Sequence, residues 1–180
     1  YWDENYSVPC RDLSHANCGF HLEDGSVQAG SHLYGLRELD KRVRAVLQEN
    51  NRPFPNSLVH TTATIPSVLA FADINLVAER GTKTLDFIDY WDLPRLENAA
   101  AGAWGLNIMW IPQWGGTTMQ GGPNTPENSR TMLAALKLFD LNIWQIMCVE
   151  SLLQKFRDIE NEFGISEKDS CFFGYWTDES

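Results

Sequence analysis

Two adjacent carboxylates, Asp3 and Glu4, stand near the beginning of the chain behind the aromatic pair Tyr1-Trp2. No capping or turn residue precedes them, so the tetrapeptide has the pattern of the end of a buried strand. In α/β barrels, catalytic groups lie at the C-terminal tips of such strands. One carboxylic acid can protonate a leaving oxygen while a second carboxylate helps to hold the substrate. Successive strand residues point to opposite faces, so both acids can serve one site only if the strand bends or ends there.

Other polar side chains lie at or near the ends of predicted strands. His60 lies in a short β-branched run at 57–62, and Glu79 ends an apolar run at 75–79. His60 is a candidate sugar ligand, Glu79 a candidate ligand of a substrate hydroxyl or a second acid, and Asp73 a third candidate substrate-binding residue. Each also has a structural explanation. His60 could be a core residue, Asp73 could end a helix, and Glu79 could form an ion pair with a neighbouring cation.

Two tryptophans flank a proline at another strand end. Trp110 precedes Pro112 and Trp114 follows it, and the strand itself is predicted at 106–112. A flat indole face can stack on a sugar ring, although most tryptophans in a globular domain fill the core. Trp110 and Trp114 are therefore candidate substrate-binding residues, with core packing as the alternative.

The elements that must position these residues alternate along the chain. Apolar residues recur at helical spacing, or concentrate in short β-branched and aromatic runs. Residues 5–33, in contrast, are rich in Gly, Ser, Asn and Asp and predict a long loop that contains an Asp24-Gly25 turn. We expect helices at 33–47, 65–72, 93–103, 129–139 and 148–163, and strands at 57–62, 75–79, 106–112, 141–144 and 171–176.

This alternation predicts an α/β fold with a parallel sheet and helical crossovers. Most of the long polar loops follow strands, which favours an α/β barrel of the TIM type with one functional rim. With 180 residues the chain is short for a whole eight-stranded barrel. An open doubly wound sheet is the alternative, but no Gly-x-Gly-x-x-Gly follows a strand.

The composition limits the partners. The chain has 180 residues and a formal charge of -10, which argues against a nucleic-acid partner. No apolar run is long enough for a membrane span. Four cysteines, at positions 10, 18, 148 and 171, form no Cys-x-x-Cys pair, and no histidine spacing completes a zinc site, so no structural metal is expected. No cofactor is expected either. Cys10 and Cys18 could be disulfide-bonded or free.

Taken in order, several segments resemble the catalytic barrel of glycosidases related to glycoside hydrolase family 123. The matching segments span nearly the whole chain. They are Tyr1-Trp2-Asp3-Glu4, Leu36-Arg37-Glu38 with Lys41-Arg42, His60-Thr61-Thr62, Ala70-Phe71-Ala72-Asp73-Ile74, Glu79, the stretches 101–114 and 130–144, and Phe173-Gly174-Tyr175-Trp176.

The resemblance implies hydrolysis of N-acetylhexosamine-containing glycans, assisted by the substrate's own acetamido group. In that family an adjacent Asp-Glu pair ends the fourth strand of the barrel, so Glu4 would be the general acid/base and Asp3 would orient the acetamido group. The resemblance thus implies a partial (β/α)8 TIM-type barrel of about strands four to eight, a fragment of a larger protein. Residues 1–168 would form its C-terminal half, and 169–180 the final strand and the start of a linker to a missing downstream domain. The resemblance further implies a secreted or cell-envelope protein whose partners are a carbohydrate substrate and the complementary part of the barrel or a larger assembly. The alternatives are a non-catalytic carbohydrate-binding or structural barrel and a disulfide-bonded helical secreted binding protein.

Overall fold

The computed structural model describes residues 1–15, 18–61, 64–79, 87–100, 105–111, 125–145, 148–165 and 167–175. Its contacts divide the chain into two compact units, Tyr1–Leu76 and Val77–Ser180. Each unit is described by itself. Among the described residues, no helix has the length and apolar character needed to cross a membrane.

Four parallel strands form the main sheet, as the alternation of elements predicted. The strands are β4 (Leu58–His60), β5 (Ile74–Val77), β6 (Asn107–Trp110) and β7 (Asn142–Ile143), and they neighbour one another in that order. The register of β4 and β5 pairs His60 with Leu76. Trp2 adds an isolated parallel bridge to Val59. The predicted α/β class, with helices between parallel strands, is confirmed.

The first unit holds two helices and a second, smaller sheet. Helix α1 (Leu33–Glu49) follows the predicted apolar stripe, and α2 (Pro66–Leu69) begins with a proline, which fits the first helical turn. The two helices pack against each other. Leucine and valine side chains on α1 are only half-buried or exposed, and its one fully buried side chain is Asp40.

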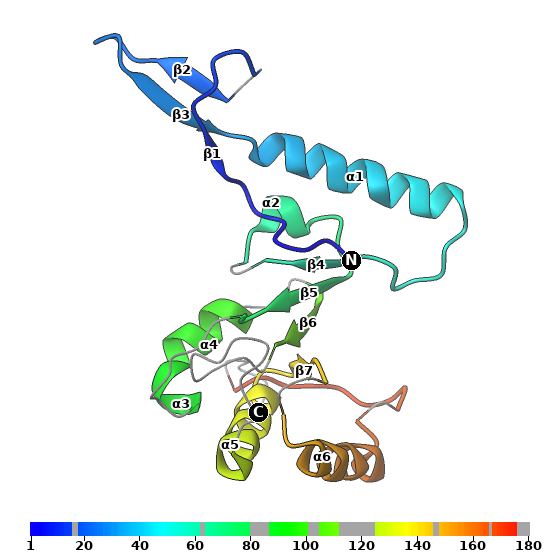
Figure 1. The fold of residues 1–180 in the computed structure, drawn as a ribbon. Helices are drawn as coiled ribbons and strands as arrows, with labels where there is room; N and C mark the ends of the chain where they lie inside the picture. The colour runs from blue at the N-terminus through cyan, green and yellow to red at the C-terminus, as the bar shows by residue number, and fades with distance from the viewer. Residues whose placement is uncertain are drawn as a thin grey trace. The chain divides into compact units, whose positions relative to one another are not determined.

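The small sheet lies within the stretch that the sequence predicted to be a loop. Strands β1 (Pro9–Cys10), β2 (Gly19–His21) and β3 (Val27–Ser31) are antiparallel, and β3 is the central strand (Figure 1). The predicted turn does connect β2 to β3, with Gly25 at φ 81°. The expectation of a long loop was therefore wrong for these residues. Asp-Gly is a hairpin signal, but the strands are too short and too exposed to show alternation.

The second unit contains the apolar core. Its helices are α3 (Phe87–Tyr90), α4 (Leu93–Ala100), α5 (Pro126–Lys137) and α6 (Glu150–Phe163). Helix α5 packs against α3 and lies beside α6 (Figure 1). The largest fully buried side chains of this core are Phe87, Trp110, Met132, Leu136 and Leu141.

Caps fix the ends of two of these helices. Thr125 accepts a hydrogen bond from the backbone N–H of Asn128 and begins α5. Gly164, at φ 80°, ends α6 in the left-handed conformation. The strand expected at 171–176 is not formed by residues 171–175, which follow an irregular course.

Candidate active site

The backbone places Asp3 and Glu4 in a turn at the C-terminal end of β4. Trp2 donates from its N–H to the carbonyl of Leu58 (2.9 Å), and its own carbonyl accepts from the N–H of His60 (2.8 Å). After the two acids, the N–H of Asn5 donates to the carbonyl of His60 (2.9 Å). Glu4 has a positive φ of 47°, so strand geometry ends at this residue. The condition under which adjacent acids can serve one site is therefore met.

Asp3 is held by two hydrogen bonds to one of its oxygens. Oδ1 accepts from the hydroxyl of Tyr1 (2.8 Å) and lies 2.9 Å from Nδ1 of His60. These bonds, that to His60 first, hold the pKa of Asp3 below its ordinary value. An ionised carboxylate can only accept, so the proton of the His60 bond belongs to Nδ1. The Asp3 side chain is 66% exposed, whereas His60 is buried.

The aromatic pair in front of the acids is less buried than the sequence suggested. Tyr1 is 66% exposed and Trp2 is half-buried. The hydroxyl of Tyr1 is the atom that reaches Asp3. The expectation of a buried aromatic strand was therefore wrong for Tyr1, while the strand pairing of Trp2 was predicted.

A buried polar pair anchors the chain directly after Glu4. The side-chain amide of Asn5 donates to both carboxylate oxygens of Asp40 on α1, at 3.0 and 3.1 Å. Both side chains are 5% exposed, and removal from water raises the pKa of Asp40. Sequence reasoning missed this pair. The signal was present, because Asp40 lies four residues after Leu36 and three before Val43, inside the apolar stripe of α1.

Asp73 lies at the opposite end of the same strands. Its Oδ2 accepts from the N–H groups of Asn56 (2.8 Å) and Ser57 (3.0 Å), and its Oδ1 pairs with the guanidinium of Arg44 on α1. Asn56 and Ser57 precede β4, and Asp73 itself precedes β5. Asp73 therefore joins the N-terminal ends of these strands to α1, and the structure does not bring it to Asp3.

The remaining predicted ligands belong to the second unit. Glu79 is half-buried and follows β5 by two residues. Trp110 is 0% exposed and packs edge-on against Trp91, with ring centroids 4.6 Å apart, and against Phe87, at 6.0 Å. For Trp110, core packing, the alternative to stacking on a sugar, therefore accounts for the ring. Trp114 lies outside the described residues.

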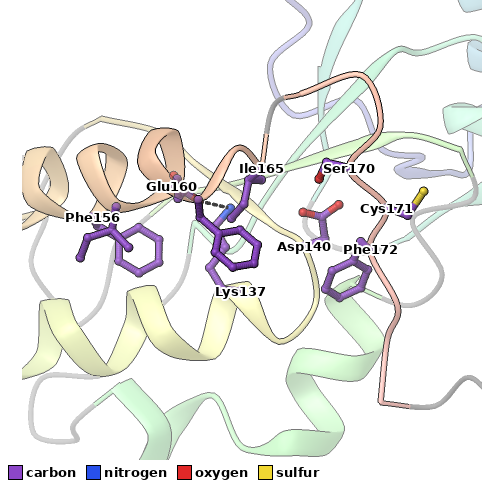
Figure 2. A pocket seen from close by; sticks show the side chains of 10 residues that line it. Lys137, Asp140, Phe156, Glu160, Ile165, Ser170, Cys171 and Phe172 are labelled. Atoms are coloured by element: carbon purple, nitrogen blue, oxygen red, sulfur yellow. Dashed lines mark ion pairs between the residues drawn. The ribbon is translucent and has the colours of Figure 1, made fainter. Parts of the chain in front are cut away.

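A pocket of about 440 Å³ also lies in the second unit (Figure 2). It is lined by α5, α6 and the segment that follows α6, with aromatic side chains such as Phe156 and Phe172 on its walls. The ion pair between Lys137 and Glu160 (2.7 Å) joins the two helices beside it. Its volume suits a small ligand, but none of the predicted site residues lines it.

The two adjacent carboxyl groups, Asp3 and Glu4, differ in their hydrogen-bond partners. Asp3 is oriented and kept anionic, whereas the exposed side chain of Glu4 makes no hydrogen bond or ion pair within the described part of the chain. Such a pair can orient a substrate with one group and exchange a proton with the other. Comparisons of the chain with family models, with curated proteins and with solved structures gave no match.

Proposed function

We propose that this chain contributes the acid–base pair of a glycoside hydrolase that acts on N-acetylhexosaminides. Glu4 is the general acid/base and Asp3 orients the acetamido group of the substrate. The observation that carries the proposal is the turn at Asp3-Glu4, which brings both acids to the C-terminal end of β4 with Asp3 held by His60.

The contacts of Asp3 suit an orienting role. Tyr1 and His60 both bind to Oδ1, and the proposed role assigns the hydrogen bond from the substrate's amide N–H to the other oxygen, Oδ2. A carboxylate that accepts from the acetamido N–H increases the electron density on the acetamido oxygen. The lowered pKa of Asp3 keeps the group ionised for this purpose at neutral pH.

The proposed reaction has two steps. In the first, the acetamido oxygen bonds to the anomeric carbon while the bond to the leaving oxygen breaks, and Glu4 gives its proton to that oxygen. This step leaves a cyclic oxazolinium whose N–H is bound to Asp3. In the second step, water attacks the anomeric carbon, Glu4 takes a proton from the water, and the acetamido oxygen is released. Both carboxyl groups return to their starting states.

The fold that we propose for this chemistry is a partial (β/α)8 barrel. Trp2, β4, β5, β6 and β7 would correspond to strands four to eight. The sequence order of the main-sheet strands matches their spatial order, and helices lie between them along the chain. In such barrels the C-terminal ends of the strands carry the catalytic groups, which is the end of β4 at which Asp3 and Glu4 lie.

The test is hydrolysis of a chromogenic aryl N-acetylhexosaminide by the full-length protein. We expect Glu4→Gln to lower kcat by about 100- to 10,000-fold, because the proton donor is lost. Asp3→Asn should lower kcat while Glu23→Gln, a change at an exposed acid of the same unit, should leave it unaltered. The matched aryl hexoside, with a hydroxyl in place of the acetamido group, should not be cleaved.

Two results would overturn this proposal. Turnover that is unchanged in Glu4→Gln would remove Glu4 from the reaction. Binding of the glycoside by the wild-type protein without release of the aryl group would instead support a non-catalytic carbohydrate-binding protein.

A further inference from the structure

Two cysteines and a histidine of the small antiparallel sheet come together. Cys10 ends β1, Cys18 directly precedes β2, and His15 lies in the connection between these strands. One potential ligand atom of each, the two Sγ atoms and a ring nitrogen, lies within 4.8 Å of the others. All four cysteines of the chain are free thiols in the structure. This cluster is independent of Asp3 and Glu4.

The histidine of this cluster is oriented as metal-bound histidines usually are. Its Nδ1 faces Cys10 Sγ (3.8 Å), and its Nε2 faces Oδ2 of Asp12 (3.4 Å). A carboxylate that binds the second ring nitrogen selects the tautomer and the ring orientation needed for ligation. Asp12 is itself fixed, since its Oδ1 accepts from the N–H (2.8 Å) and the hydroxyl (2.7 Å) of Ser14.

Backbone hydrogen bonds close the connection between the two cysteines. The N–H of Cys18 donates to the carbonyl of His15 (3.2 Å), and the N–H of Gly19 donates to that of Asp12 (3.3 Å). Glycine is required at position 19, because a Cβ atom there would lie 2.6 Å from the carbonyl oxygen of Arg11. The loop therefore brings its ligand side chains together through its own backbone.

The sheet that carries the cluster has little else to stabilise it. None of the residues of β1, β2 and β3 is buried, and Phe20 and Val27 are exposed. Small elements that cannot bury apolar surface are commonly stabilised by a disulfide or a metal ion. Two thiolates and an imidazole are the donor set that zinc prefers.

We propose that Cys10, His15 and Cys18 bind a zinc ion that cross-links β1 to β2. His15 would ligate through Nδ1, and Asp12 would accept the hydrogen bond from Nε2. Water, or a group outside these residues, would complete a tetrahedral site. The expectation of no metal was based on the lack of a Cys-x-x-Cys pair and of a zinc-like histidine spacing, and the spacing Cys-x4-His-x2-Cys has neither.

Titration of the reduced full-length protein with Co²⁺ tests the site, because Co²⁺ reports tetrahedral thiolate ligation in its absorption spectrum. We expect equimolar binding, with a thiolate-to-cobalt charge-transfer band, and displacement of Co²⁺ by Zn²⁺. Cys10→Ser and Cys18→Ser should each remove the tetrahedral spectrum. The double variant Cys148→Ser/Cys171→Ser, which changes the cysteines outside the cluster, should keep it in full.

Asp12→Asn provides a milder variant that retains all three ligands. Its Zn²⁺ affinity should fall by about 10- to 100-fold, as expected when the carboxylate partner of a ligating histidine is lost. His21→Ala, a change at a histidine outside the cluster, should have no effect on affinity.

Three results would overturn the proposal. Reduced protein could fail to develop the cobalt spectrum, or the spectrum could depend on Cys148 or Cys171. The third is a Cys10–Cys18 disulfide, seen in the intact mass of the native protein purified without reductant, whose reduction does not yield a protein that binds Co²⁺.

Discussion

Two aspartates of the first unit have pKa values that their surroundings shift in opposite directions. Asp3 is exposed and accepts hydrogen bonds from His60 and Tyr1, which lower its pKa. Asp40 is buried with Asn5, and its removal from water raises its pKa. Both aspartates act next to Glu4. Asp3 precedes it in the chain, and Asp40 binds Asn5, the residue that follows it.

The raised pKa of Asp40 predicts a pH dependence of stability. A group whose pKa is higher in the folded state stabilises the fold fully below its unfolded pKa, and this contribution is lost as the pH rises through the folded pKa. Asp40→Asn removes the titration. The free energy of unfolding of wild type, measured by urea denaturation, should therefore fall relative to that of Asp40→Asn as the pH is raised from acid to neutral. Parallel curves for the two proteins would contradict this prediction.

A second substitution at position 40 tests the hydrogen bonds between Asn5 and Asp40 separately from the charge of Asp40. Asp40→Ala removes both acceptors of the Asn5 amide, which stays buried without a partner in that pair. A buried unsatisfied donor costs about 1–3 kcal/mol, so Asp40→Ala should be less stable than Asp40→Asn at every pH. Equal stability of the two variants would show that the Asn5–Asp40 contact is not formed.

The lowered pKa of Asp3 can be tested one partner at a time. His60 makes the larger contribution and Tyr1 the smaller, so His60→Leu should raise the pKa of Asp3 more than Tyr1→Phe does. The measurement is an NMR titration of the side-chain carboxyl carbon. Asp24, whose pKa is lowered by its hydrogen bonds with Ser26, provides an internal reference that neither variant should alter. An unchanged Asp3 titration in both variants would contradict the hydrogen bonds at Oδ1.

At the scale of elements, the sequence predicted those with a strong period. The stripe that begins at Leu33 and the apolar face of 148–163 became α1 and α6, because long amphipathic helices carry many repeats of one signal. The small sheet was missed because its strands span two to five residues and none of them is buried on one face. Without a buried face, a strand has no alternation to detect.

The candidate site was predictable only in part. The sequence predicted His60 near Asp3 and Glu4 because the C-terminal ends of neighbouring parallel strands lie at the same edge of a sheet. Asp73 was expected there too, but it immediately precedes β5, at the other end of the strand. The helix expected at 65–72 and the strand expected at 75–79 already place Asp73 before the strand, so its chemistry as a carboxylate, and not its position, made it a candidate.

Two glycines on different helices allow a matched test of helix geometry. Gly164 ends α6 at φ 80°, and a Cβ atom there would lie 3.1 Å from Cγ of Glu167. Gly164→Ala should therefore destabilise its unit by about 1–2 kcal/mol, the cost of the left-handed conformation for a residue with a side chain.

Gly35 is the control for this change. It lies in the first turn of α1 with open space around its Cα, so Gly35→Ala should stabilise the helix by about 0.5–1 kcal/mol. Thermal and urea unfolding of the two variants should shift in opposite directions. A shift in the same direction would contradict the assigned end of α6 or the position of Gly35 within α1.

At the scale of the whole molecule, the two units differ in the polar side chains that they bury, although both bury apolar ones. The apolar core cluster lies in the second unit, between Val77 and Leu153. Of the described polar and charged residues that are buried, all but Ser129 lie in the first unit. They are Asn5, Asp40, Ser57, His60, Thr61, Asp73 and Asn75. Buried polar groups weaken a core unless they are satisfied. Asn5 and Asp40 satisfy each other directly after the Asp3-Glu4 turn, whereas Asp73 is satisfied at the opposite end of β4 and β5.

This division predicts a pattern of amide hydrogen exchange. Amides of β6 and α5, whose side chains form the apolar core, should exchange slowest, because they exchange only when the core opens. Amides of β1, β2 and β3 should exchange fastest among the strands, since none of their residues is buried. A ligand that binds only the folded sheet stabilises it in proportion to the logarithm of its excess over Kd.

Zn²⁺ should therefore slow exchange in β1, β2 and β3 and leave β6 and α5 unchanged, because the proposed ligands Cys10, His15 and Cys18 all lie in or beside the small sheet. In Cys10→Ser the same addition should slow nothing. Uniform protection of both units by Zn²⁺, or protection that persists in Cys10→Ser, would place the ion elsewhere. Slow exchange of the small sheet without any metal would show that it is stable by itself, and the reason for a cross-link between β1 and β2 would be lost.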